Sequence, residues 1–237
     1  KNGNITEFSI NPKDLNINHG VKFNMVQKTL DQLLISLPEV KAGKGIWQNP
    51  FHEFDVYDHS LDFVKHIKDL TVDLNLIVAG YLHDIGKPVC KIPTYKDGVL
   101  QEKEPGKPYH RFKNHEHVGA NMVREMNSNI FLQYGLDKIK IADLVECHFI
   151  PMKNIREMRK TTTFDNFMEK YNALEREFDG CNVSRKEIMT MFLADKLAQG
   201  KGCTDKHELF AIRNAVLGKD VFLKEIYNLQ QKEYHTI

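Results

Sequence analysis

Five titratable side chains of this sequence fall where helical spacing predicts an inward, apolar position. His59 lies four and eight residues before Phe63 and Ile67, so all three share one helix face. His83 and Asp84 close an apolar segment that begins at residue 74. His148 and Asp195 likewise align with apolar residues in the helical turns before them. The full set is His59, His83, Asp84, His148 and Asp195.

These residue types favour metal binding. An unpaired carboxylate in a protein core is so costly that it protonates instead, so Asp84 and Asp195 require a cation, a metal or strong donors nearby. Histidines and carboxylates that converge from different helices are the usual ligands of divalent transition metals. A single inward histidine is more often an ordinary core residue, but that explanation would have to hold at all five positions.

His115 is a sixth candidate ligand. It stands at the start of a predicted helix whose next turn carries Gly119 and Ala120, small residues that permit close helix packing. Its neighbour His117 projects about 200° away around the helix and is expected to face solvent. Six ligands could hold two metal ions, with Asp84 bridging them.

The elements that must position these residues are helices, and the predicted fold class is all-α. Val26, Leu30 and Leu33 repeat at helical spacing before a stop at Pro38. Further helical patterns cover residues 59–70, 74–86, 115–126, 135–149, 164–178, 184–199 and 206–228. Residues 1–20 are polar and aperiodic, which predicts an N-terminal arm followed by a single helical domain over residues 21–237.

Residues 88–113 interrupt the helical pattern. Prolines and glycines recur through this stretch, and a Lys96-Asp97-Gly98 turn separates short β-prone pieces. We expect a long loop or a short hairpin insertion. Loops of this length in compact domains are often functional, which favours a role as a lid or in contacting substrate.

Composition indicates a soluble globular protein. The 237 residues are 41% hydrophobic and 27% charged, and no apolar run approaches the roughly 20 residues of a membrane span. A net charge of +1 provides no global attraction for nucleic acid, so RNA contact would have to be local. Four cysteines without CxxC spacing fit reduced thiols. A cytoplasmic location without membrane contact follows as the expectation.

The motifs around the candidate ligands resemble a known family. They are FHEFDVYDHSL (51–61), YLHDIGKP (81–88), RFKNHEHVGA (111–120), LVECHFIP (144–151) and LADKLAQG (193–200). Their order is similar to that of the HD superfamily of metal-dependent phosphohydrolases, and specifically to the HD domain of bacterial CCA-adding tRNA nucleotidyltransferases. The pattern of that superfamily, a histidine, a His-Asp pair and a distant aspartate, falls on His59, His83, Asp84 and Asp195.

This resemblance implies an HD-domain helical bundle with its motif core at residues 51–200. It also implies one or two divalent ions (Mn, Ni, Mg, Fe or Co) and a phosphatase, 2′-nucleotidase or 2′,3′-cyclic phosphodiesterase acting on a nucleotide or RNA end. A nucleotidyltransferase head is not found in the sequence. The Ile85-Gly86-Lys87 continuation lacks the Glu-Asp pair of alarmone hydrolases, and the GYP motif of cyclic-di-GMP phosphodiesterases is also missing.

Asp84 and Lys87 are the predicted catalytic residues, and Lys87, Arg111 and His52 are candidates for substrate contact. Lys87 follows His83 by about one turn where the helix ends, so its ammonium is expected to be free to reach a substrate phosphate, or to interact with the helix dipole. Arg111 and His52 lie within the matched segments and are predicted to contact phosphate or protonate the leaving group.

Other conspicuous residues have plainer interpretations. The basic stretch Lys153–Lys160 could follow a nucleic-acid backbone, but a solvated basic face is the expected alternative. The aromatic residues expected in the core are Trp47, Phe51, Phe164, Phe167 and Tyr171.

Two other functions remain open from the sequence. One is a non-catalytic RNA-binding or regulatory module on the same scaffold. The other is a deoxynucleoside triphosphohydrolase, which shares the four core ligands.

Overall fold

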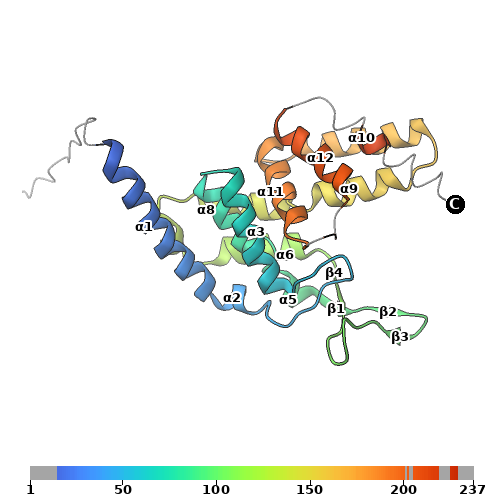
Figure 1. Ribbon diagram of the computed structural model, residues 1–237, viewed down its shortest axis with the longest axis horizontal. Helices are drawn as coiled ribbons and strands as arrows, with labels where there is room; N and C mark the ends of the chain where they lie inside the picture. Colours follow the sequence, from blue (N-terminus) through green and yellow to red (C-terminus); the bar gives the residue numbers. More distant parts are fainter. Residues whose placement is uncertain (1–14, 201, 203–204, 219–224, 229–237) are drawn as a thin grey trace, which may run out of the picture.

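The computed structural model describes residues 15–200, 202, 205–218 and 225–228. Over these residues the chain is predominantly helical, which confirms the expected all-α class (Figure 1). The helices are α1 (Leu15–Ser36), α2 (Pro38–Lys41), α3 (Val56–Leu70), α4 (Leu74–Leu82), α5 (Lys87–Cys90), α6 (His115–Glu125), α7 (Asn129–Leu132), α8 (Lys138–Cys147), α9 (Ile150–Arg159), α10 (Phe164–Asp179), α11 (Arg185–Leu197) and α12 (Lys206–Val216).

Aspartate side chains fix where three of these helices begin. Asp55 accepts a hydrogen bond from the backbone N–H of Asp58 at the start of α3. Asp73 caps α4, and Asp137 caps α8 by accepting from two backbone N–H groups. Each carboxylate satisfies amides that a helix leaves without partners at its first turn. The starting points of α3, α4 and α8 are therefore set locally by the sequence.

Helices α3, α4, α6, α8 and α11 pack together around the hydrophobic core. Its largest fully buried side chains include Phe63, Phe131, Phe167 and Phe192. Helices α9, α10 and α12 gather at one end of the molecule, and α1 runs along the opposite end (Figure 1). The helices of the packed core are those that carry the candidate ligands.

The insertion around 88–113 forms two antiparallel strand pairs. Strand β1 (Lys91–Pro93) pairs with β4 (His110–Phe112), and β2 (Tyr95–Lys96) pairs with β3 (Val99–Leu100). The expected turn joins β2 to β3 through Asp97 and Gly98, whose φ angles are 52° and 77°. Two positive φ angles give the turn the twist that a two-residue hairpin needs.

Several boundaries differ from the sequence patterns. An N-terminal arm was expected at residues 1–20, and residues 1–14 of it lie outside the described residues. Its last six residues belong to α1, because a helix once nucleated propagates through residues of modest propensity. The helix expected over 206–228 ends at Val216, followed by Gly218 with φ 69°. Helix α9 was not predicted, although Pro151 in its first turn and the spacing of Ile155 and Met158 favour one.

Two of the aromatic predictions were wrong. Phe51 and Phe164 are 68% and 55% exposed, whereas Phe167 is fully buried as expected. Phe51 lies in a turn rather than on a helix, so helical spacing carried no information about its burial.

None of the helices within the described residues is both long and apolar enough to cross a membrane.

Candidate metal centre

The structure brings the six predicted ligands together from five helices. His59 is the fourth residue of α3, and His115 is the first residue of α6. His83 and His148 occupy equivalent positions, each immediately after the last residue of its helix, α4 and α8. Asp195 lies in the last turn of α11. Helix ends from across the fold therefore meet at one buried point.

Each of the four histidines directs one ring nitrogen to a backbone carbonyl. The Nδ1 atoms of His59, His83, His115 and His148 lie 3.0, 2.8, 3.0 and 2.6 Å from the carbonyl oxygens of Ala198, Gly80, Phe112 and Val145. A carbonyl only accepts hydrogen bonds, so Nδ1 carries the proton and Nε2 keeps the lone pair that binds a metal. Two of these carbonyls lie in the last turns of α4 and α8, where helices leave them without partners.

Asp84 lies among these four Nε2 atoms. Its Oδ2 is 3.1 Å from Nε2 of His83 and 3.7 Å from Nε2 of His59. Its Oδ1 is 3.5 Å from Nε2 of His115 and 3.9 Å from Nε2 of His148. Each carboxylate oxygen thus faces its own pair of histidines.

Asp195 and His52 extend the cluster on the His59 side. Nε2 of His59 lies 2.9 Å from Oδ1 of Asp195. The rings of His52 and His59 meet edge to face, with centroids 5.2 Å apart. Nδ1 of His52 lies 2.9 Å from Oδ1 of Asn49, and since that oxygen accepts, Nε2 is the nitrogen left for other chemistry.

The donor set fits a divalent metal. Three groups have one potential ligand atom per residue, with the atoms of each group all within 4.8 Å of one another: His59–His83–Asp84, Asp84–His115–His148 and His52–His59–Asp195. Asp84 is 1% exposed; its Oδ2 has Lys87 as an ion-pair partner, but its Oδ1 accepts no hydrogen bond from the described residues. A bound cation would compensate the negative charge of such a buried carboxylate.

The electrostatic environment keeps the outer histidines neutral. Burial and the charge of Lys87 lower the pKa of His115 to about 3, and burial and His83 lower the pKa of His148 to about 4. Burial alone would lower the pKa of His83, but the adjacent Asp84 outweighs it and raises that pKa.

Both carboxylates stay ionised for a related reason. Burial alone would raise the pKa of Asp84, but His83 and Lys87 hold it well below its usual range. The pKa of Asp195 is likewise below its ordinary value, because its close contact with His59 outweighs its burial. The result is anionic oxygens facing imidazole nitrogens.

Two glycines allow the helices to approach this closely. A Cβ at Gly86 would lie 2.1 Å from the carbonyl oxygen of His115 and 2.7 Å from the backbone nitrogen of Gly119. A Cβ at Gly80 would lie 2.8 Å from the ring of Phe63, which stacks on His83 with centroids 4.3 Å apart. The prediction that Gly119 permits close packing is confirmed, and its partner is the backbone at Gly86.

Lys87 is not free, contrary to expectation. Its Nζ lies 2.6 Å from Oδ2 of Asp84 and donates to Oε1 of Gln48 at 2.6 Å. The side chain turns inward because Asp84, three residues earlier, presents a buried negative charge. Gln48 was missed by the sequence reasoning, since a single amide between Trp47 and Asn49 carries no periodic signal.

The remaining candidates lie farther out. Arg111 is exposed on β4, opposite Ile92 of β1, and no described contact joins it to the cluster. His117 has a 59% exposed side chain beside Glu146, as predicted.

Residues 56–200 match the HD domain family, and this match covers more than half of the chain. The chain belongs to the HD domain family. HD domains are generally metal-dependent phosphohydrolases, and the His-Asp cluster described above could hold such a metal.

Two curated proteins are similar to this chain. It is 28% identical to the A-adding tRNA nucleotidyltransferase of Deinococcus radiodurans over 127 residues, which cover 53% of the chain and 27% of that protein. It is 25% identical to the CC-adding tRNA nucleotidyltransferase of Thermus thermophilus over 167 residues, 69% of the chain and 32% of that protein. The matches thus span a third or less of the length of either relative. No solved structure matches the chain.

Proposed function

We propose that this HD domain hydrolyses a phosphomonoester or phosphodiester at a nucleotide or an RNA end, with its catalytic centre at Asp84. The activity would be that of a phosphatase, a 2′-nucleotidase or a 2′,3′-cyclic phosphodiesterase. The observation that carries the proposal is the convergence of four imidazole Nε2 atoms on the two oxygens of one buried carboxylate.

The residues divide naturally into two ligand groups. His59, His83 and Asp195 lie on the Oδ2 side of Asp84, and His115 and His148 lie on the Oδ1 side. Divalent ions held there would lower the pKa of bound water and offset negative charge on phosphoryl oxygens. Asp84 is the only one of the six that faces both groups, so it is the residue expected to bridge two ions.

The reaction forms a bond from a water oxygen to phosphorus and breaks the bond from phosphorus to the leaving oxygen. One proton leaves the water and one proton reaches the leaving group, so atoms and charge balance. His52 would exchange a proton at Nε2, a role supported by the contact of its Nδ1 with Asn49. Lys87 orients Asp84, and its ammonium can turn to an incoming phosphate only by leaving one of its two present partners.

The named relatives support an RNA-end substrate. Both are tRNA nucleotidyltransferases, one A-adding and one CC-adding. An HD domain related to theirs is reasonably expected to meet the 2′ and 3′ oxygens and phosphates of RNA ends.

Metal analysis of purified protein and a substrate panel test the proposal. The panel contains p-nitrophenyl phosphate, 2′-nucleotides, 2′,3′-cyclic nucleotides and deoxynucleoside triphosphates. We expect bound divalent metal and hydrolysis of one of the first three classes. Hydrolysis of deoxynucleoside triphosphates alone would replace the proposal with a triphosphohydrolase, and bound RNA without any hydrolysis would replace it with a non-catalytic module.

The variant Asp84→Asn tests the role of this carboxylate, since it keeps the side-chain volume and removes the charge. Asp69→Asn is its control, because Asp69 is exposed on α3, the helix that carries His59. We expect Asp84→Asn to lose at least about a hundredfold in activity, as removal of one electrostatic group from a catalytic site commonly does. Activity unchanged by Asp84→Asn would refute the proposed centre.

A further inference from the structure

A cavity of about 430 Å³ adjoins the candidate metal centre. This volume lies within the range of about 300–1,000 Å³ typical of small-molecule sites. His52 belongs both to the cavity lining and to the potential ligand group of His59 and Asp195. The cavity therefore opens beside the proposed reaction centre.

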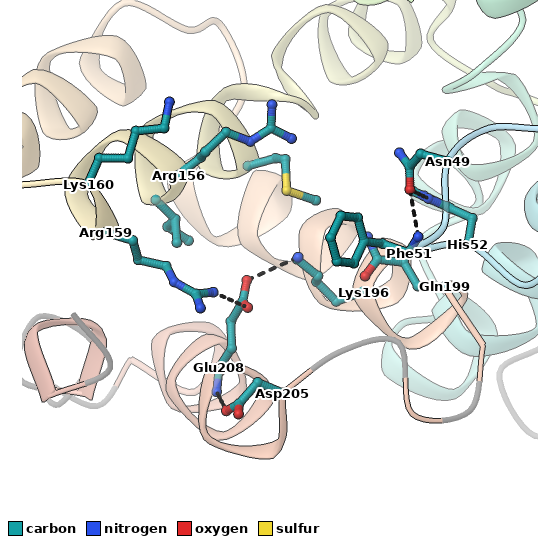
Figure 2. A pocket seen from close by; sticks show the side chains of 12 residues that line it. Asn49, Phe51, His52, Arg156, Arg159, Lys160, Lys196, Gln199, Asp205 and Glu208 are labelled. Atoms are coloured by element: carbon teal, nitrogen blue, oxygen red, sulfur yellow. Dashed lines mark hydrogen bonds and ion pairs between the residues drawn. The ribbon is translucent and has the colours of Figure 1, made fainter. Parts of the chain in front are cut away.

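The two sides of the cavity differ in chemistry. Figure 2 shows Arg156 and Arg159 on α9, Lys160 directly after it, and Phe51 and His52 on the facing segment. Four basic and two acidic side chains line the whole space. An anionic ligand is favoured by that excess of positive charge.

Both acidic side chains of the lining already have partners within the protein. Glu208, 5% exposed, lies 3.1 Å from Arg159 and 3.0 Å from Lys196. Asp205 accepts from two backbone N–H groups at the start of α12. Arg156, by contrast, is exposed and has no hydrogen bond or ion pair within the described part of the chain. It is therefore the lining cation that can bind a ligand without breaking an existing ion pair.

Phe51 offers the cavity an aromatic face. Its side chain is 68% exposed, although burying an aromatic ring is strongly favourable. Oδ1 of Asn49 accepts from the Phe51 backbone N–H at 2.9 Å and also contacts Nδ1 of His52. One amide oxygen thus fixes the backbone of the aromatic residue and the ring of the residue beside the reaction centre.

We propose that this cavity binds the nucleoside that carries the reacting phosphate, with Phe51 stacking on its base and Arg156 contacting its 5′-phosphate. The inference rests on the proposed function and narrows its substrate to a nucleotide with phosphates on both sides of the ribose. A 3′-terminal RNA nucleotide that carries a 2′-, 3′- or 2′,3′-cyclic phosphate meets that requirement, since its 5′ side is a phosphodiester. Stacking on an aromatic ring tolerates any base, so the cavity selects nucleotides without selecting their sequence.

Paired substrates separate the two contacts. Adenosine 2′,5′-bisphosphate and adenosine 2′-monophosphate differ only in the 5′-phosphate, and glycerol 2-phosphate has neither an aromatic ring nor a 5′-phosphate. We expect Arg156→Gln to raise KM about tenfold for the bisphosphate and to leave the monophosphate unchanged. Phe51→Ala should raise KM about tenfold for both nucleotides. Neither variant should alter hydrolysis of glycerol 2-phosphate.

Arg213→Gln and Phe210→Ala are the matched controls, because both residues are exposed on α12 and do not line the cavity. Both controls should behave like the parent with every substrate. Unchanged nucleotide kinetics in Phe51→Ala and Arg156→Gln would overturn the inference. A parallel loss with glycerol 2-phosphate would also overturn it, since the residues would then act through the reaction centre.

Calorimetric titration with adenosine 5′-monophosphate keeps this test independent of hydrolysis. If the parent hydrolyses nothing, the proposed function fails, but the cavity assignment is still decided by binding. Weaker binding by both variants than by the parent supports the inference. Equal binding, or none by the parent, contradicts it.

Discussion

Gly86 is the position where the turn that carries His83 and Asp84 touches the backbone of α6. In Gly86→Ala the new methyl group would lie 2.1 Å from the carbonyl oxygen of His115, where ordinary contacts begin at 3.4 Å. The two segments must therefore separate by about 1.3 Å, because backbone atoms cannot rotate away as a side chain can. We expect destabilisation of about 3 kcal/mol, the upper part of the usual range for overpacking.

That cost corresponds to a Tm about 6–12 °C lower for a chain of this size. The separation would also move His115 away from Asp84, so we expect less metal bound per chain. Thermal unfolding by circular dichroism and metal analysis measure the two effects. Gly180→Ala is the control, because its Cβ would make only ordinary contacts at 3.5 Å and its φ is −80°. Equal Tm values for the two variants would refute the close backbone contact.

Three further predictions concern the site and its supports. His148→Ala should lower the metal content per chain, whereas His117→Ala should not; equal metal content would remove His148 from the ligand set. Glu208→Gln should reduce stability by about 3 kcal/mol in denaturant titrations, because two basic side chains lose a buried partner. Glu187→Gln should reduce stability at pH 7 by about 1 kcal/mol, since burial is outweighed by Lys140 and the capping box of α11, which hold the pKa of this carboxyl below its ordinary value. A depressed folded-state pKa stabilises above the unfolded pKa, so the difference from the parent should shrink as the pH falls below about 4.5, and a constant difference would contradict this.

The ligand positions could be predicted because they depend on helical phase. His59 shares a face with Phe63 and Ile67, which are fully buried, so burial of the face implied burial of the histidine. The same logic placed His117 in solvent. Phase within one helix is a local property and needs no knowledge of the fold.

The contacts made between elements could not be predicted in the same way. The inward turn of Lys87 depends on Gln48, which arrives from a segment about forty residues earlier and has no periodic pattern. The cavity arises where α9 and α12 meet the turn at Phe51, and its composition follows from tertiary packing. Arg156 was therefore foreseen only within a basic stretch that either follows a nucleic-acid backbone or is a solvated face.

The most direct test of the central claim is an anomalous difference map from crystals of this protein soaked in Mn²⁺. The cluster predicts a peak at bonding distance, about 2.1 Å, from Asp84 and from Nε2 of His59 and His83. A second peak beside His115 and His148 would identify a two-ion centre bridged by Asp84. A map without a peak at Asp84 would contradict the claim that this cluster is the metal centre.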